Sequence, residues 1–314
     1  AGAGTIEVTN IGAGAAGVTG DTRIGNANTT TLTLDGTVYN ANVATYTATA
    51  GNNIALSAGA ATTFTATNDA IAFNTAGILL SNGSDLVVNT GAGAGDIAIL
   101  NITGNTVEDV TLNAGTGNVA VGLIGAAATQ INDVTITGTT ITLSGNINTS
   151  NTGTDLGDVD INGNVALGGA VTIDTDAGDG TVNISGTVDN GVAFAISSGT
   201  GAVGIGGNIG AGTALTSLTI NAAGTGAITL SGNIGAGGAG VTGATAVGNA
   251  NTTNLTLGGT VYNANAATYT AVAGNTIDLT AGATTTFTST ADNITFATGT
   301  VELANGSNLV VNSA

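Results

Sequence analysis

The 314-residue sequence contains no proline, cysteine, methionine, tryptophan or histidine, and Arg23 is its single cationic residue. Glu occurs three times and Gln once. Apart from Ala and Leu, the residues that favour helix interiors are therefore nearly missing, whereas β-branched Val, Ile and Thr are abundant. This composition excludes a helical protein. The missing proline fits a fold in which nearly every strand amide is needed by a neighbouring strand.

The shortage of positive charge and of cysteine excludes further classes. Nineteen acidic side chains against one Arg give a net charge of −18. A nucleic-acid binder needs Lys and Arg to displace counterions, so nucleic acid is not expected as a partner, and neither is an anionic lipid surface. No stretch approaches the roughly 18 apolar residues of a transmembrane helix. Without cysteine there are no disulfides, thiol chemistry or Cys-based metal sites.

Enzymatic activity is not expected either. Nucleophilic schemes based on serine, cysteine or lysine lack their usual base or nucleophile. Paired carboxylates serve some polysaccharide-cleaving enzymes, but such sites also need cations or aromatic residues to hold a sugar. With four Tyr, five Phe and no Trp, the chain is poorly equipped for that task. We assign no catalytic residue and no cofactor other than the calcium considered below.

The residues that are present indicate an ordered all-β protein. Gly-rich chains of low complexity are often disordered, but 42% of this sequence is hydrophobic and the mean hydropathy is +0.40. The apolar residues alternate with small polar ones, which is the pattern of strands with one buried face.

One phrase occurs twice: TVYNANVATYTA at Thr37–Ala48 and TVYNANAATYTA at Thr260–Ala271. A shift of 223 positions aligns residues 10–91 with residues 233–314, and about 57 of these 82 pairs are identical. The second copy stops in the middle of a phrase that the first copy continues, and no signal peptide is visible. We therefore expect a processed or excised piece of a longer tandem array.

A finer period runs through the chain and is marked by the tetrad SGNI and its variants. Successive markers lie 18 to 27 residues apart, about 23 on average. This spacing suits one turn of a right-handed parallel β-helix with three short strands per turn. We predict a single continuous β-solenoid over residues 1–314; the alternative is an array of β-sandwich domains of roughly 90–110 residues each. The third residues of the markers are Asn146, Asn164, Thr187, Asn208, Asn233 and Thr260.

Turns are predicted at six dipeptides whose first residue is Asn or Asp and whose second is Gly, since both reach left-handed backbone angles at low cost. They begin at Asn82, Asn162, Asn190, Asn305, Asp35 and Asp179.

Calcium is the chemical ligand for which the sequence offers a motif. Residues 158–163 read DVDING, the opening of a calcium loop, but Gly169 stands where the bidentate Glu should be. A second acidic group, DTDAGDG, follows about one turn later. The alternative is an acidic outer strand face that runs into an Asn-Gly turn. The candidate ligands are Asp158, Asp160, Asn162, Asp174, Asp176 and Asp179.

Threonine and aromatic residues suggest two further surfaces. T-x-T runs at residues 29–34, 62–67 and 284–290 locally resemble the arrays of ice-binding solenoids, although they look scattered along the chain and not stacked. Tyr39 and Tyr46, with their second-copy counterparts Tyr262 and Tyr269, could form an aromatic glycan-binding surface. The alternative for these aromatic residues is packing in a wider part of the core.

Runs such as NAGTGNVAV, AAGTGAITLSGNI and ANGSNLVVNSA resemble the repeat regions of large secreted bacterial adhesins, of the filamentous-haemagglutinin or autotransporter-passenger type. The resemblance implies a right-handed β-helix that is exported and displayed at the cell surface.

From these observations we expect a structural protein: an extracellular fibre or stalk that associates with itself, end to end or laterally. The alternatives are an adhesin passenger that binds host or surface glycans, and an ice-binding solenoid.

Overall fold

The computed structural model describes residues 3–12, 17–105, 108–150, 156–221, 224–236 and 240–313. In these ranges all regular structure is β-strand, and no helix is present that could cross a membrane. The strands run parallel and stack into a β-solenoid of about 12 turns with about 24 residues per turn. The predicted parallel solenoid is confirmed, with a slightly longer period than expected.

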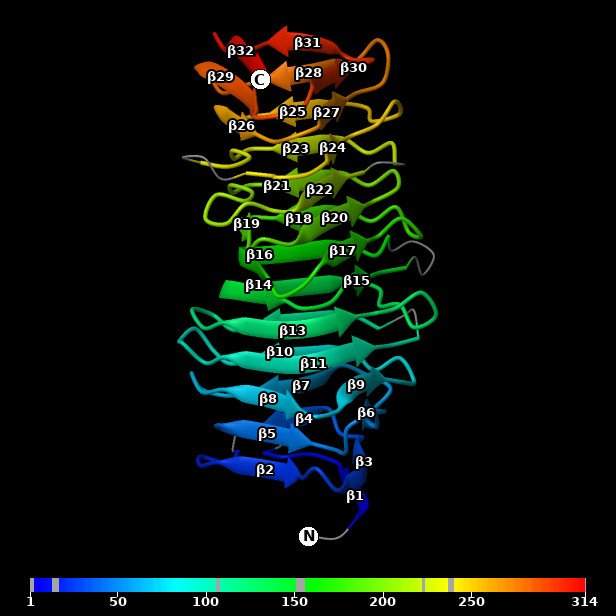
Figure 1. The fold of residues 1–314 in the computed structure, drawn as a ribbon. Helices are drawn as coiled ribbons and strands as arrows, with labels where there is room; N and C mark the ends of the chain where they lie inside the picture. The colour runs from blue at the N-terminus through cyan, green and yellow to red at the C-terminus, as the bar shows by residue number, and fades with distance from the viewer. Residues whose placement is uncertain are drawn as a thin grey trace. The chain divides into compact units, whose positions relative to one another are not determined.

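The chain divides into two compact units, residues 1–155 and 156–314, and Figure 1 shows the strands of each unit stacked one above another. Each turn of unit 1 has three faces, which we call A, B and C. Face A contains β4 (Val38–Asn40), β7 (Thr62–Thr65), β10 (Leu86–Asn89), β12 (Val110–Asn113) and the first half of β14 (Val134–Leu143). Face B contains β2 (Thr22–Gly25), β5 (Ala44–Thr47), β8 (Ile71–Asn74), the first parts of β11 (Ile97–Thr103) and β13 (Val119–Ile124), and the second half of β14. Face C contains β1 (Gly4–Val8), β3 (Thr29–Leu34), β6 (Asn53–Leu56), β9 (Gly77–Leu80), the ends of β11 and β13, and β15 (Ile147–Asn148).

Unit 2 has three faces of the same kind, which we call A′, B′ and C′ after their counterparts in the 223-residue repeat. Face A′ contains the end of β16 (Val159–Leu167), β19 (Val188–Asp189), β26 (Val261–Asn263), β29 (Thr284–Ser289) and β32 (Asn308–Ser313). Face B′ contains β17 (Val171–Asp174), β20 (Ala193–Ser197), β22 (Ser217–Ile220), β24 (Thr245–Val247), β27 (Ala267–Thr270) and β30 (Ile294–Ala297). Face C′ contains the start of β16, β18 (Val182–Ile184), β21 (Val203–Ile205), β23 (Ile228–Leu230), β25 (Leu255–Leu257), β28 (Thr276–Leu279) and β31 (Thr300–Leu303).

The alternation in the sequence decides which side chains fill the solenoid. On face A, Leu86 pairs with Val110, which pairs with Val134, each one turn of 24 residues further along the chain. All three side chains are buried. The residues between them on each strand point outward and are partly exposed. A column of stacked aliphatic side chains therefore lines the inside of the face, and burial of this apolar area favours folding.

Some corners are turned without any loop. Strands β11, β13, β14 and β16 each begin on one face and end on the next. Asn162-Gly163, predicted as a turn, lies inside β16 and is one of these bends, so that prediction was wrong. Asn82-Gly83 and Asn305-Gly306 do form left-handed turns, with φ of 58° and 72° in the first and 55° and 77° in the second.

Corners that interrupt the strand ladder leave backbone N–H groups that need another acceptor. Asn and Asp side chains supply it: an oxygen in one turn accepts a hydrogen bond from a backbone N–H in the next turn, so that the corners are tied together along the axis. The acceptor–donor pairs include Asn10 with Thr37 and Val38, Asn42 with Thr67, Asn68 with Gly93, Asp96 with Asn118, Asn101 with Leu123, Asp179 with Thr200, Asp189 with Gly212 and Thr213, and Asn265 with Thr290.

The tetrad markers belong to this set of corners. The Asn164 side-chain oxygen accepts from the Thr187 N–H at 3.1 Å, that of Asn208 from Asn233 at 2.9 Å, and that of Asn233 from Thr260 at 2.8 Å. For these three pairs the marker spacing equals the length of one turn, because the Asn of one turn bonds to the marker of the next.

All four tyrosines and four of the five phenylalanines are buried in the core, and Phe296 is partly exposed. Tyr39, Tyr46, Phe64 and Phe73 are at most 2% exposed, and the Tyr39 ring stacks on that of Phe64 with centroids 4.8 Å apart. The Tyr39 hydroxyl donates to the carbonyl oxygen of Val8 at 2.6 Å. These side chains are not available for a glycan-binding surface, so the packing alternative is confirmed.

Candidate functional site

The first predicted calcium ligands lie at the beginning of β16. The Asp158 carboxylate accepts a hydrogen bond from the Thr181 N–H at 2.7 Å, one turn further along the chain. Asp160 and Asn162 are exposed on the strand. Asp158 therefore has a corner-tying role of the kind described above.

The second predicted acidic group lies at the corner between faces B′ and C′. The Asp174 carboxylate accepts from the N–H of Asp176 at 3.1 Å, and that of Asp179 accepts from Thr200 at 2.7 Å. Across the described ranges, no group of three or more His, Cys, Asp or Glu side chains is arranged to hold a metal ion. Calcium binding at these residues stays a prediction.

An acidic column on face A was missed at the sequence level. Asp85, Asp109 and Asp133 lie 24 residues apart, each directly before an inward-facing Leu or Val. The Asp85 carboxylate accepts from the Asp109 N–H at 3.0 Å, and the Asp109 carboxylate accepts from Asp133 at 3.2 Å. The detectable signal was an Asp before successive V-T-L and V-T-I runs.

The pKa of Asp85, the first residue of this column, is shifted by its surroundings. Burial raises the pKa of the Asp85 carboxyl, the hydrogen bond from Asp109 lowers it, and the negative charges of Asp109 and Glu108 raise it again; the net direction is upward. Glu108 is fully buried, and its carboxylate accepts from the Asn105 N–H at 2.6 Å.

Face A carries a regular outward array, which we call the face A lattice. One column contains only β-branched residues and the other only Asn and Thr, and consecutive rows are in register. Rows lie about 4.8 Å apart and the columns roughly 6.7 Å apart. Thr63 and Thr65 lie in the same two columns as Thr135 and Thr137, but two rows separate the pairs, so T-x-T does not recur in successive turns of this face. The columns are Val38, Thr63, Val87, Thr111 and Thr135, and Asn40, Thr65, Asn89, Asn113 and Thr137.

The array occurs again on face A′ of unit 2, as the face A′ lattice. The six residues of its three rows are identical to those of the first three rows of face A. One neighbouring column differs: where face A has Ala61 and Asp85, face A′ has Thr284 and Asn308. The columns of the face A′ lattice are Val261, Thr286 and Val310, and Asn263, Thr288 and Asn312.

A shallow groove with no charged side chain adjoins each lattice. The groove beside face A has a volume of about 280 Å³ and that beside face A′ about 190 Å³. Both are smaller than the roughly 300–1,000 Å³ of sites for drug-sized ligands. The eight residues that line the first recur, 223 positions on, among the nine that line the second. The eight are Gly17, Val18, Thr19, Asn40, Ala41, Asn42, Thr65 and Thr67.

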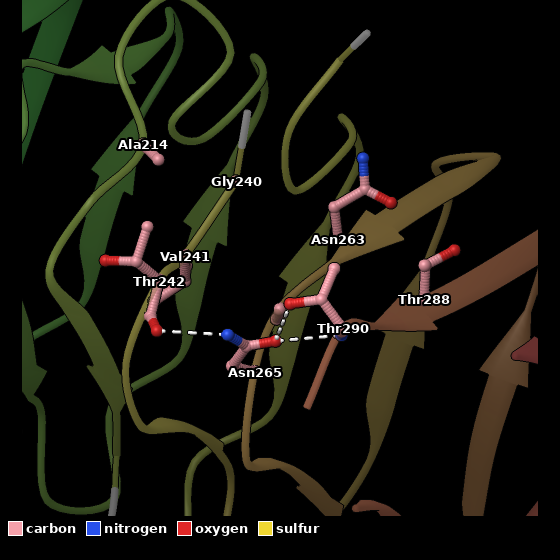
Figure 2. Close-up of a pocket in the computed structure, with 9 residues that line it drawn as sticks. Ala214, Gly240, Val241, Thr242, Asn263, Asn265, Thr288 and Thr290 are labelled. Atoms are coloured by element: carbon pink, nitrogen blue, oxygen red, sulfur yellow. Dashed lines mark hydrogen bonds between the residues drawn. The ribbon is translucent and has the colours of Figure 1, made fainter. Parts of the chain in front are cut away.

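Figure 2 shows the Asn265 amide between Thr242 and Thr290 in the second groove. Its nitrogen donates to the carbonyl oxygen of Thr242 at 3.2 Å, and its oxygen accepts from the N–H and the hydroxyl of Thr290, each at 3.0 Å. Gly240 is needed here, because a Cβ atom would lie 2.0 Å from the carbonyl oxygen of Asn263. The groove is therefore fixed by its own hydrogen bonds.

Neither family models, curated proteins nor solved structures gave a match to the chain. Function has to be argued from the chain's own residues.

The lattices and grooves offer hydroxyl, amide and methyl groups. None of their lining side chains is charged. Such a surface can bind a partner by shape and neutral hydrogen bonds, but it has no group that would serve as an acid, a base or a nucleophile at neutral pH.

Proposed function

We propose that this chain is a structural segment of an extracellular stalk or fibre. The observation that carries the proposal is the continuity of axial bonding within each unit, where strand ladders run on three faces and Asn or Asp side chains tie the corners between them. A load along the axis is then shared among many parallel hydrogen bonds, and stiffness follows from the many residues that hold each turn to the next.

The acidic surface supports the same role. A net charge of −18 on 314 residues keeps such molecules soluble at high local concentration. The composition offers few sites for trypsin, which would find only Arg23, and this suits life outside a cell.

Growth of the fibre by whole turns is compatible with the packing inside the first copy. There Leu80 and Val88 are fully buried, because β11 and β12 of the next turn pair with their strands. Turns added in the same way would pair their strand edges with those of the turn before.

Electron microscopy of the native material tests the proposal. Filaments with an axial repeat near 4.8 Å, the spacing of stacked strands, are expected. Discrete particles without that repeat would contradict the fibre role. Denaturing electrophoresis of the same material then distinguishes one long chain from many short ones by the mass of the polypeptide.

Ice binding is a second candidate, and the face A lattice is the observation that favours it. β-branched side chains have few rotamers, and the Asn89 and Asn113 amides are held by the N–H groups of Gly91 and Gly115 at 2.9 and 3.0 Å. The array is therefore rigid, regular and able to hold ordered water.

Thermal hysteresis measures this activity directly. If the lattice binds ice, the chain should depress the freezing point below the melting point, and Thr65→Glu should abolish the gap. Thr45→Glu is the control, since Thr45 is likewise partly exposed but lies on face B. No hysteresis in the unmodified chain would exclude this function.

A further inference from the structure

We propose that the two lattices bind each other between copies: the face A lattice of one molecule packs laterally on the face A′ lattice of a second. This inference rests on the proposed fibre function and names the lateral partner, a second copy of this chain.

Charge is the first argument. Two copies of a chain with net charge −18 repel each other, and they approach most easily where their surfaces are neutral. The outward residues of the face A′ lattice and of its edge column, Thr284 and Asn308, include no carboxylate. Face C′, by contrast, presents Asp160, Asp278 and Glu302 along one outward column. Face A′ is thus the better surface for contact between copies.

The edge columns decide which lattice is the partner. On face A the edge carries the carboxylates of Asp85, Asp109 and Asp133, so two A faces would bring like charges together. When the three matched rows face each other, the Asp85 carboxylate meets the edge column of Thr284 and Asn308, whose hydroxyl and amide groups can donate hydrogen bonds. A carboxylate has about four lone-pair sites, so one that already accepts one or two hydrogen bonds has room for others. The pairing of A with A′ is therefore favoured over A with A.

Shape is the second argument. Three rows of the two lattices contain the same residues in the same register, so both present the same pattern of methyl, hydroxyl and amide groups. Flat faces of β-branched and Asn side chains can interdigitate, as in the packed sheets of fibrils. Because the side chains are already ordered, little conformational entropy is lost on contact.

The absence of cysteine makes a direct test simple. One preparation carries Thr65→Cys and a second, with a different affinity tag, carries Thr288→Cys; the two are mixed and treated with a bismaleimide that spans about 10 Å, the spacing of packed sheets. The control pair is Thr45→Cys with Thr268→Cys, which occupy matching outward positions on faces B and B′.

The expected result is a crosslink between residues 65 and 288 at least about tenfold more frequent than one between two copies of residue 65, or than the control crosslink. Equal yields in all three mixtures would overturn the inference. Thr284→Glu places a carboxylate opposite the acidic edge and should weaken the crosslink at least about tenfold, whereas Thr268→Glu should leave it unchanged.

Electron microscopy of the same samples separates this inference from the fibre proposal. Single filaments with the 4.8 Å repeat that never pair side by side would remove the lateral contact and leave the fibre role standing. Particles without the repeat would remove the fibre role itself.

Discussion

The two copies of the 223-residue repeat fold in the same way but have different neighbouring turns. Their turns share backbone geometry: Val43 and Ala266, at matching positions, have φ of 40° and 43°, and Thr75 and Thr298 have 66° and 59°. The stacked rings of Tyr39 and Phe64 have centroids 4.8 Å apart, and those of Tyr262 and Phe287 have centroids 4.7 Å apart. Local sequence is therefore sufficient to set the shape of a turn.

Burial differs between the copies. Leu80 and Val88 are fully buried, while Leu303 and Val311 at the equivalent positions are about half exposed. The difference is the next turn, which β11 and β12 supply in the first copy. Stability is thus a property of contacts between neighbouring turns, as in other solenoids.

The largest expected effect is alkaline unfolding. Burial raises the pKa of Tyr39 to about 12, and that of Tyr262 is raised further. The neutral phenols therefore contribute stability that is complete below pH 10 and is lost as pH rises through the raised values. We expect the protein to lose stability as pH rises above about 10, which absorbance of the tyrosinate anion combined with hydrogen exchange would reveal. Tyrosines that ionise near pH 10 in the folded protein would contradict this.

A core truncation tests the dependence on neighbours. Leu80→Ala should reduce the free energy of unfolding by roughly 2–5 kcal/mol, as for a fully buried leucine. Leu303→Ala, at the matching position of the exposed turn, should cost less than about 1 kcal/mol, because little buried surface is lost. Urea unfolding with local hydrogen exchange measures both. Equal losses would mean that the exposed turn is covered in solution.

The next largest loss of stability is expected when a side chain that ties two corners together is removed. In Asn233→Ala the N–H groups of Thr260 and Val261 lose their acceptor, which lies 2.8 and 3.0 Å away. A loss of about 1–3 kcal/mol is expected for such partly buried groups. Asn233→Asp keeps the acceptor oxygen and should retain most of the stability in the same urea titration. Asn10→Ala gives the matching measurement in the first copy, where the acceptor is exposed and the loss should be smaller.

The smallest effect concerns the acidic column. Asn308 occupies in the second copy the place of Asp85, so Asp85→Asn makes the first copy resemble the second. The raised pKa of Asp85 means that its contribution to stability is present below about pH 4 and is lost as pH rises through the raised value. The variant should therefore be more stable at pH 7, by less than about 1 kcal/mol. A less stable variant at pH 7 would show that the charge is needed.

The fold was predictable because the alternation of apolar residues and the marker spacing are both local signals. The corners were harder to predict than the strands. Asn162-Gly163 has the composition of a turn but continues a strand, since two consecutive strands can join around a bend with no change in residue type. Thr65 lies between Asn40 and Asn89 in one column. This column could not be predicted from a fixed period in the sequence, because the turns differ in length between 24 and 25 residues.

The surface was harder to predict than the core. A DVDING run resembles a calcium loop, but Asp158 accepts a hydrogen bond from the next turn, a contact that depends on a residue 23 positions away. Asp85, Asp109 and Asp133 form a column because each stands directly before the first paired residue of a face A strand. These contacts depend on which residues of neighbouring turns pair with each other. That pairing can be read from the sequence only when the length of each turn is known.

The corner ties give the molecule a direction. In nearly every pair the accepting Asn or Asp oxygen lies in the earlier turn and the donating N–H in the later one; buried Asn221, which accepts from the earlier Ser198, is an exception. A chain that emerges N-terminus first therefore brings each new corner to an acceptor that is already in place. Growth in that order is templated, whereas a chain that emerged from the other end would have to hold its corner amides unbonded until the preceding turn arrived.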